Sequence, residues 1–208
     1  LNSKYLPELS DEKKQKYQNN LKTILKQIKQ IENLVNEFSD FSRMPKPTLK
    51  RNNLVKLLNE NIKLLSEVNK SIEINLNKKD EEILLECDKE QISRVFINLI
   101  KNSIESIEQK VEKNPDFKKK ISIDISSNND HILISIEDNG IGFDKNNIEE
   151  ILNPYYTTKK NGTGLGLSIV NKIINDHKGE LQFIPISNGA KIQIRFYLND
   201  NRNINSWW

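Results

Sequence analysis

Apolar residues recur every three or four positions in the first part of the chain, with lysine, glutamate and other polar residues between them. The repeating apolar residues are Leu21, Ile24, Leu25, Ile28, Ile31, Leu34, Val35, Phe38 and Phe41. This spacing predicts one long helix with an apolar stripe. Ser10 supplies an N-cap, and Pro45 and Pro47 end the helix. No second long helix follows in the pattern, so two arrangements stay open: a self-pairing bundle, or packing of the stripe on the chain's own globular part.

After the two prolines the pattern changes to shorter apolar segments separated by turn residues. It predicts helices over residues 52–66 and 88–110, and a third from the glycines at 162–166 to about His177, with Gly179 as its left-handed C′ residue. Strands are predicted at 71–76, 82–86, 120–126, 132–138, 180–185 and 190–198. Strands interleaved with helices in this way are typical of one α/β domain whose sheet is covered on one side.

The composition of the 208 residues narrows the function classes. The net charge is only +3 and acidic and basic residues alternate, which argues against the basic face of a nucleic-acid or anionic-lipid binder. The single Cys87 excludes an internal disulfide and favours a reducing compartment. Apolar stretches such as 95–97 are far shorter than the roughly 18 residues of a membrane span. We therefore expect a cytoplasmic polypeptide without membrane contact and, because it begins with Leu1, a piece of a longer protein.

The predicted helix at 88–110 carries the first residues that point to chemistry. Asn98, Asn102 and Glu105 form a polar line beside its buried face, because they stand at positions i, i+4 and i+7. Two interpretations stay open for the asparagines. They are either surface amides that bind water, or neutral oxygen ligands for a hard cation such as Mg²⁺.

A second group of residues stands at the end of the predicted strand 132–138. Asp138 is followed by Asn139, Gly140 and Gly142, a composition that also occurs in a plain turn. The alternative is a pocket for a flat ring. There the carboxylate accepts a hydrogen bond from an exocyclic amine, and the glycines let the backbone approach the ring.

Two further stretches complete the set. The polar loop 153–160 ends in Lys159 and Lys160, and the glycine-rich stretch 162–167 leads directly into a helix. Backbone N–H groups and the positive end of a helix favour an anion there. A glycine pattern alone is a weak signal, but the four stretches together describe a pocket for a magnesium nucleotide.

In this order the four stretches resemble the N, G1, F and G2 boxes of sensor histidine kinases, within the wider GHKL ATPase group, over residues 48–198. Residues 33–45 are similar to the second dimerisation helix of nitrogen-regulation kinases of the NtrY type. The resemblance implies a Bergerat-type α/β sandwich, a mixed sheet covered by helices, preceded by a long dimerisation-type helix. It divides the chain into the second helix of a dimerisation and phosphoacceptor hairpin (1–46), an ATP-binding catalytic domain (47–198) and a frayed C-terminal tail (199–208).

The resemblance also implies that ATP and Mg²⁺ are bound. The residues that it places at the nucleotide are Asn98, Asn102, Asp138, Gly140, Gly142, Lys159, Gly162, Thr163, Gly164, Leu165 and Gly166. Among them, Asn102 and Asn98 would serve the metal and the phosphates, and Asp138 would accept the adenine amino group. Gly140 and Gly142 would line the base, and Lys159 would reach the phosphates.

Two departures from related patterns matter. Asn98 stands where the ATP-hydrolysing relatives carry a glutamate that activates water, and an amide cannot act as that base, so transfer is favoured over hydrolysis. Leu152 stands where phenylalanine is common in the F box, which concerns the packing of the lid.

The acceptor histidine of such kinases lies on the first helix of the hairpin, which this sequence does not contain. We expect His131 and His177 to be turn and helix-end residues instead. The implied function is transfer of the γ-phosphoryl group of ATP to a histidine on the dimerisation domain of the same kinase, for relay to a response regulator. The whole kinase is expected to be a homodimer, and this piece the cytosolic part of a membrane-anchored sensor. The alternatives are a GHKL-type ATPase and a non-catalytic nucleotide-binding module, a pseudokinase.

Overall fold

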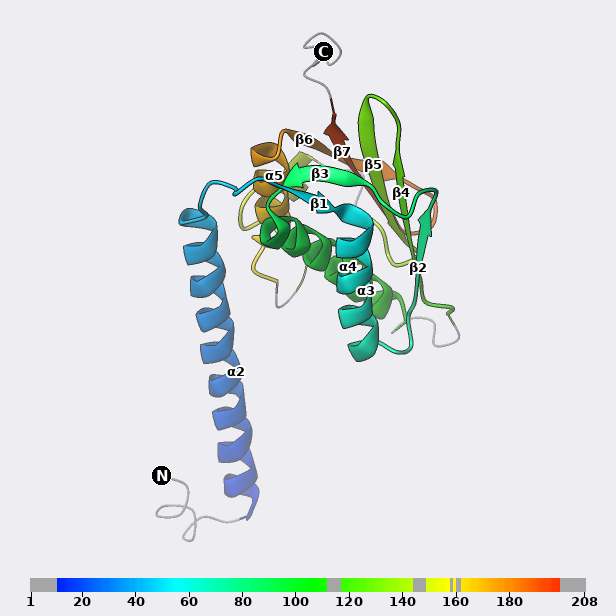
Figure 1. Ribbon diagram of the computed structural model, residues 1–208. Coiled ribbons are helices and arrows are strands. Elements are labelled where there is room, and N and C mark those ends of the chain that lie inside the picture. Colours follow the sequence, from blue (N-terminus) through cyan, green and yellow to red (C-terminus); the bar gives the residue numbers. More distant parts are fainter. Residues whose placement is uncertain (1–10, 112–116, 144–148, 158, 160–161, 199–208) are drawn as a thin grey trace. The chain divides into compact units, whose positions relative to one another are not determined.

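The computed structural model describes residues 11–111, 117–143, 149–157, 159 and 162–198 (Figure 1). The chain divides into two compact units. The first comprises Leu1–Met44 with Thr158–Thr163, and the second comprises Pro45–Thr157 with Gly164–Trp208. The predicted N-cap Ser10, Lys160 and the tail 199–208 lie outside the described residues.

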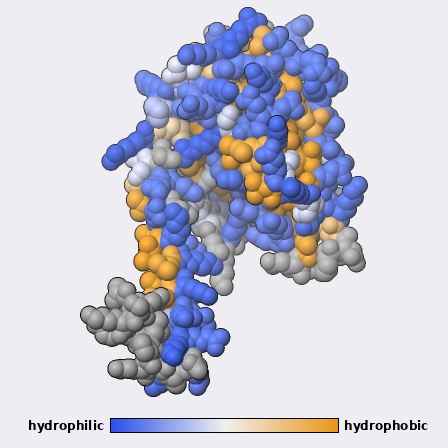
Figure 2. Space-filling model, turned by 60° about the horizontal axis from the view of Figure 1, so that its bottom comes forward, coloured by the Kyte–Doolittle hydropathy of each residue, from blue (hydrophilic) through white to orange (hydrophobic). Residues whose placement is uncertain are grey.

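The first unit contains the long helix α2 (Asp11–Ser42), which the hydrophobic pattern predicted. Its apolar stripe is largely exposed to solvent: seven of its nine residues keep between 37% and 63% of their surface accessible, and they are Ile24, Leu25, Ile28, Ile31, Leu34, Val35 and Phe38. Figure 2 shows this apolar surface along the helix. An exposed apolar stripe of this length indicates an interaction surface.

The second unit is built on a five-stranded sheet in the order β2-β4-β5-β7-β6. The strands are β2 (Glu73–Lys78), β4 (Lys120–Ser127), β5 (His131–Asp138), β7 (Ala190–Tyr197) and β6 (Gly179–Pro185). β2 pairs with β4 in parallel, and the other pairs are antiparallel, so the sheet is mixed, as predicted. β4 and β5 form an antiparallel hairpin, and both strands were predicted from the sequence.

Helices cover one face of this sheet (Figure 1). They are α3 (Leu54–Val68), α4 (Lys89–Val111) and α5 (Gly166–Asp176), and the short 3-10 helix η2 (Glu149–Leu152) precedes α5. The covered face follows from the alternation along the strands: in β7, Ala190, Ile192, Ile194 and Phe196 are buried, and the residues between them are half-buried. Phe96 and Leu99 of α4 are fully buried in the same core.

A separate two-stranded ribbon differs from the sequence prediction. The predicted strand at 82–86 is β3 (Leu84–Cys87), but it pairs with β1 (Lys50–Asn53) and not with the main sheet. β1 contains only polar residues, so no hydrophobic alternation marks it. For this reason the helix predicted from residue 52 begins two residues later, at Leu54.

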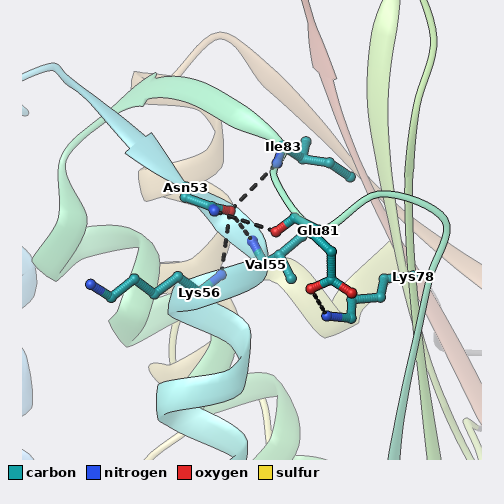
Figure 3. A network of polar contacts seen from close by, with 6 residues as sticks. All are labelled: Asn53, Val55, Lys56, Lys78, Glu81 and Ile83. Carbon is teal, nitrogen blue, oxygen red and sulfur yellow. Dashed lines mark hydrogen bonds and ion pairs between the residues drawn. The ribbon is translucent and has the colours of Figure 1, made fainter.

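Asn53 fixes that helix start (Figure 3). Its side-chain oxygen accepts hydrogen bonds from the N–H groups of Val55 at 3.0 Å and Lys56 at 3.4 Å, which is N-cap geometry for α3. The same oxygen accepts from Ile83 N–H at 3.4 Å, and the amide group donates to the Glu81 carbonyl at 3.5 Å. One side chain therefore ends β1, begins α3 and holds the loop before β3.

The prediction of Gly179 as the residue that ends α5 is wrong. His177 is the C-cap, and Lys178, with φ at 58°, takes the left-handed conformation. Gly179 already belongs to β6, and a Cβ there would lie 2.9 Å from the Arg195 carbonyl oxygen and from the Phe196 ring. The glycine is thus required by close packing and not by the turn.

Both histidines lie where they were predicted, at a turn and at a helix end. His131 begins β5 after the hairpin turn, where its N–H group donates to the Asn128 side chain at 2.8 Å. His177 is buried, its Nδ1 lies 2.8 Å from the Ile173 carbonyl oxygen, and its Nε2 accepts a hydrogen bond from Asp88 N–H at 3.0 Å.

Within the described parts of the chain, no helix has the length and apolar character that crossing a membrane requires.

Candidate nucleotide-binding site

Asp138 ends the central strand β5 as a buried carboxylate, with 5% of its surface exposed. Burial raises the pKa of this carboxyl group above its usual range, although hydrogen bonds oppose the shift. Gly140 N–H donates to its Oδ1 at 2.9 Å, and the Ser106 hydroxyl donates to the same oxygen at 3.3 Å. The Ser103 hydroxyl and the Ala190 N–H group also favour the charged form of this carboxylate, which has about four acceptor positions on its two oxygens.

Helix α4 holds the loop that follows Asp138. Lys110 donates from Nζ to the carbonyl oxygens of Asn139 at 2.7 Å and Gly140 at 3.0 Å. Ile141 N–H donates to Ser106 Oγ at 3.1 Å. A Cβ at Gly140 would lie 2.2 Å from Ser106 Oγ and 2.5 Å from the Ser106 backbone, so this position needs glycine for contact with the helix.

Gly142 has a different requirement. Its φ is +80°, in the left-handed region that favours glycine, and a Cβ would lie 2.5 Å from the Gly189 carbonyl oxygen. The loop after β5 therefore packs backbone to backbone on the turn before β7. Both predicted glycines are structurally constrained, and the constraints that the structure shows come from the protein itself.

Asn98 lies on α4 next to the start of α5. Its amide group donates to the Arg94 carbonyl oxygen at 3.0 Å, and its Oδ1 is 3.6 Å from the position that a Gly166 Cβ would take. Asn102 follows one turn later on α4 and is half-buried like Asn98. The predicted metal ligand Asn98 and the predicted phosphate cradle at Gly166 are thus neighbours.

A depression of about 410 Å³ opens on α4 beside Asn98. Three cations, Lys89, Arg94 and Lys101, line it together with Asn98, Glu90, Ser93 and Ile97. Asp138 is not among the lining residues, so the depression lies at the Asn98 end of the site. Cations beside a neutral amide oxygen suit a phosphate chain with its metal.

The glycine-rich stretch meets α5 as predicted, but its residues differ in what they can offer. Gly164 has a φ of +70° and lies against the backbone of Tyr155, whose N–H donates to the Gly164 carbonyl oxygen at 3.1 Å. Leu165 is fully buried, so only its backbone is available to a ligand. Leu152, the unusual residue of the F box, is half-buried, and its carbonyl oxygen accepts from Ser168 of α5 at 3.1 Å.

Eight of the eleven predicted residues belong to the second unit, and Lys159, Gly162 and Thr163 belong to the first. Gly162 N–H donates to the Lys159 carbonyl oxygen at 3.2 Å. The Thr163 hydroxyl donates to the carboxylate of Glu37 on α2.

Sequence reasoning missed three residues around Asp138: Ser103, Ser106 and Lys110. The Ser103 hydroxyl also favours the charged form of Asp138. A signal was available, because Asn98, Asn102, Ser106 and Lys110 follow one another at intervals of four on one helix. The polar row predicted from the sequence continued with Glu105 instead of Ser106, and the Glu105 side chain is exposed.

The family described as histidine kinase-, DNA gyrase B-, and HSP90-like ATPase matches residues 87–200 of the sequence. The chain belongs to this family.

Among the relatives of this ATPase-family chain is an NtrY-like sensor histidine kinase of Rickettsia bellii, 32% identical over 198 residues, which are 95% of this chain and 31% of the relative. The catalytic domain of the histidine kinase ThkA, solved without nucleotide, matches with a TM-score of 0.63 and 29% identity over 72% of this chain and 95% of that one. ThkA in complex with the response regulator TrrA matches with a TM-score of 0.70 and 26% identity over 95% of this chain and 54% of that one. The chain spans about a third of the length of the curated relatives it matches.

These matches confirm the predicted family, its NtrY-type relatives and the α/β fold class with a helix before the sheet.

Proposed function

We propose that the chain is the ATP- and Mg²⁺-binding catalytic part of a sensor histidine kinase. It presents ATP so that the γ-phosphoryl group is transferred to a histidine on a dimerisation domain, for relay to a response regulator. Membership of the ATPase family and relatives named sensor histidine kinases support this proposal.

The observation that carries the proposal is the buried Asp138 carboxylate. An ionised group at this depth is costly unless it is paired, and its raised pKa records that cost. An adenine amino group that donates to it would offset part of the cost. Guanine would instead present a carbonyl oxygen to the carboxylate, so the pocket selects ATP over GTP.

The chain's residues fit a magnesium ion at the other end of the site. Among the described residues, no three His, Cys, Asp or Glu side chains gather to hold a metal by themselves. The amide oxygens of Asn98 and Asn102 are neutral ligands of the kind that Mg²⁺ combines with water and phosphate oxygens. The metal, when bound, would neutralise charge on the phosphates.

The phosphates themselves would lie at the start of α5. The N–H groups at Gly164, Leu165 and Gly166 and the positive end of the helix attract anions. Lys159 would add a cation. Asn98 cannot remove a proton from water, and this favours transfer to a protein acceptor over hydrolysis.

The partners follow from the same chemistry. The acceptor histidine would stand on the dimerisation hairpin of the same kinase, whose second helix is α2, and the whole kinase would be a homodimer. A response-regulator receiver domain would then accept the phosphoryl group. Because ATP is the donor, we place this part of the protein in the cytosol.

Calorimetric titration of the chain with ATP, with and without Mg²⁺, tests the proposal. We expect binding of ATP that Mg²⁺ strengthens, and no measurable binding of GTP. Rapid release of inorganic phosphate without transfer would favour an ATPase, and absence of nucleotide binding would favour a non-catalytic module.

A further inference from the structure

We infer that Ser106 of α4 is a positioning residue for base recognition: its hydroxyl group holds the Asp138 carboxylate and the adjoining loop in one arrangement. The inference rests on the proposed function, because the group that Asp138 would receive is the adenine amine.

The hydrogen bonds give the Ser106 hydroxyl a fixed direction. Its oxygen accepts from Ile141 N–H at 3.1 Å, and its single proton goes to Asp138 Oδ1 at 3.3 Å. Because the Ser106 oxygen already accepts from Ile141 N–H, the hydroxyl proton is available for the carboxylate. Ser106 therefore connects the recognising carboxylate to the backbone that follows it.

Neighbouring groups pack closely around Ser106 and the Asp138 carboxylate. Gly140 N–H donates to the same Asp138 oxygen at 2.9 Å, so two donors converge on Oδ1, and the Ser103 hydroxyl and Ala190 N–H also act on this carboxylate. The space where a Gly140 Cβ would stand is already filled by Ser106, 2.2 Å away. A carboxylate held in one orientation keeps its acceptor positions in fixed directions. Such fixed directions are required to select a base with an exocyclic amine over a base with a hydrogen atom at the same position.

Lys110 provides a matched comparison on the same helix. It holds the same loop through the carbonyl oxygens of Asn139 and Gly140, on the side away from the N–H groups that Ser106 and Asp138 engage. If Ser106 only fastened the loop, loss of Lys110 would have the same effect on nucleotide selection. If Ser106 acts through the carboxylate, only its own loss changes the selection.

The experiment compares ATP with purine riboside triphosphate, which lacks the exocyclic amine, by calorimetry on the full chain with Mg²⁺. The ratio of the two affinities isolates the contact of Asp138 with the amine, because the ribose and phosphates are identical. We expect Ser106→Ala to lower this ratio by about threefold to tenfold, the range of one hydrogen bond. Lys110→Gln should weaken both nucleotides alike and keep the ratio.

A double-mutant cycle gives a second readout. In an Asp138→Asn background the ratio is already lost, so adding Ser106→Ala should change it no further. Ser106→Cys, which keeps a weak donor of similar shape, should lie between the parent and Ser106→Ala, and it replaces the alanine variant if that one does not fold.

Two results would overturn the inference. The first is an unchanged ratio in Ser106→Ala, whether both affinities stay the same or fall equally; ATP binding by the parent then still supports the proposed function. The second is absence of ATP binding by the parent, which removes the proposed function and the positioning role together.

Discussion

Asp138 is a buried carboxylate whose desolvation is offset only in part by hydrogen bonds from the protein. Burial raises the pKa of its carboxyl group, so the folded state holds the proton more tightly than the unfolded state does. The ionised form therefore destabilises the fold at neutral pH, and this destabilisation disappears as the pH falls through the raised pKa. Such a cost to stability is consistent with the binding role proposed for Asp138.

Asp138→Asn should lower the affinity for ATP at least about tenfold, which corresponds to about 1.4 kcal/mol. The thermal midpoint of the nucleotide-free variant at pH 7 should equal or exceed that of the parent, because the buried charge is gone. Calorimetry and thermal denaturation measure the two effects. A variant that binds ATP like the parent would reduce Asp138 to a turn residue.

The sequence revealed Asp138 and the asparagines because each stands in a short, ordered pattern. It did not reveal Ser106 or Lys110, since serine and lysine on a helix are common and only the folded loop brings Gly140 and Ile141 onto them. Leu165 lies inside the predicted motif and its side chain is buried in the core, so only its backbone could serve a ligand. Motif position thus predicted a candidate site but not the direction of each side chain.

At the scale of elements, Asp88 joins three parts of the second unit. Its Oδ1 accepts from Glu90 and Gln91 N–H at 3.1 Å each, which caps α4, and its Oδ2 accepts from Thr48 N–H at 2.9 Å. Its own N–H donates to His177 at the end of α5. Burial tends to raise the pKa of the Asp88 carboxyl, but these backbone hydrogen bonds and His177 lower it overall.

Asp88→Ala should lower the free energy of unfolding by about 1 kcal/mol at pH 7, as expected for the loss of an N-cap. Because the pKa of Asp88 is lowered in the folded state, its contribution is present above the unfolded value near 4 and is lost as the pH falls through the folded one. Denaturant titrations of parent and variant should therefore converge at acidic pH. Asp130→Ala, in the β4–β5 turn, is the control and should stay within about 0.5 kcal/mol of the parent. A gap that persists at low pH would contradict the role of the charge.

The exposed stripe of α2 makes a second prediction at this scale. Leu25 and Ile31 are 63% and 61% exposed, and burying them in a self-associated bundle would remove apolar surface from water. The double variant Leu25→Glu and Ile31→Glu should shift the chain towards monomer in sedimentation. Lys26→Glu, on a polar position of the same helix, should not. Equal monomer fractions in parent and double variant would show that the stripe does not self-associate.

The elements themselves were predictable where apolar spacing marks them, as in α2, α4 and the β4–β5 hairpin. β1 was not, because Lys50–Asn53 is entirely polar and is a strand only through its partner β3. The left-handed residue after α5 was misplaced because glycine is the usual choice there, whereas the structure uses Lys178 and needs Gly179 for packing. The conformation at such positions depends on tertiary contacts. The local sequence pattern does not contain information about these contacts.

At the scale of the molecule, the described part of the chain offers no histidine suited to accept a phosphoryl group. Both ring nitrogens of His177 are engaged, at 2.8 and 3.0 Å, and His131 begins a strand at a hairpin turn. We therefore expect the isolated chain to bind the phosphoryl donor but to offer no histidine that accepts the phosphoryl group.

The chain incubated with radiolabelled ATP and Mg²⁺ should therefore form no acid-labile phosphohistidine. Addition of a separate acceptor-hairpin polypeptide should give label on that polypeptide alone. Gel separation under alkaline conditions, followed by acid treatment, measures both. Label on His131 or His177 would refute the division into donor and acceptor halves.

The order of strands also sets the time at which the site comes into existence. β4–β5 and β6–β7 are hairpins of neighbouring segments, which form within microseconds, whereas β5 meets β7 only after a long loop has closed. Asp138 lies opposite Ala190 in that late pairing. During synthesis, residues from the amino-terminal side emerge first, so the carboxylate has no pocket until the last strand has left the ribosome. A chain that stops before β7 would contain almost every predicted motif of the site but would lack the strand that pairs with β5 at Asp138.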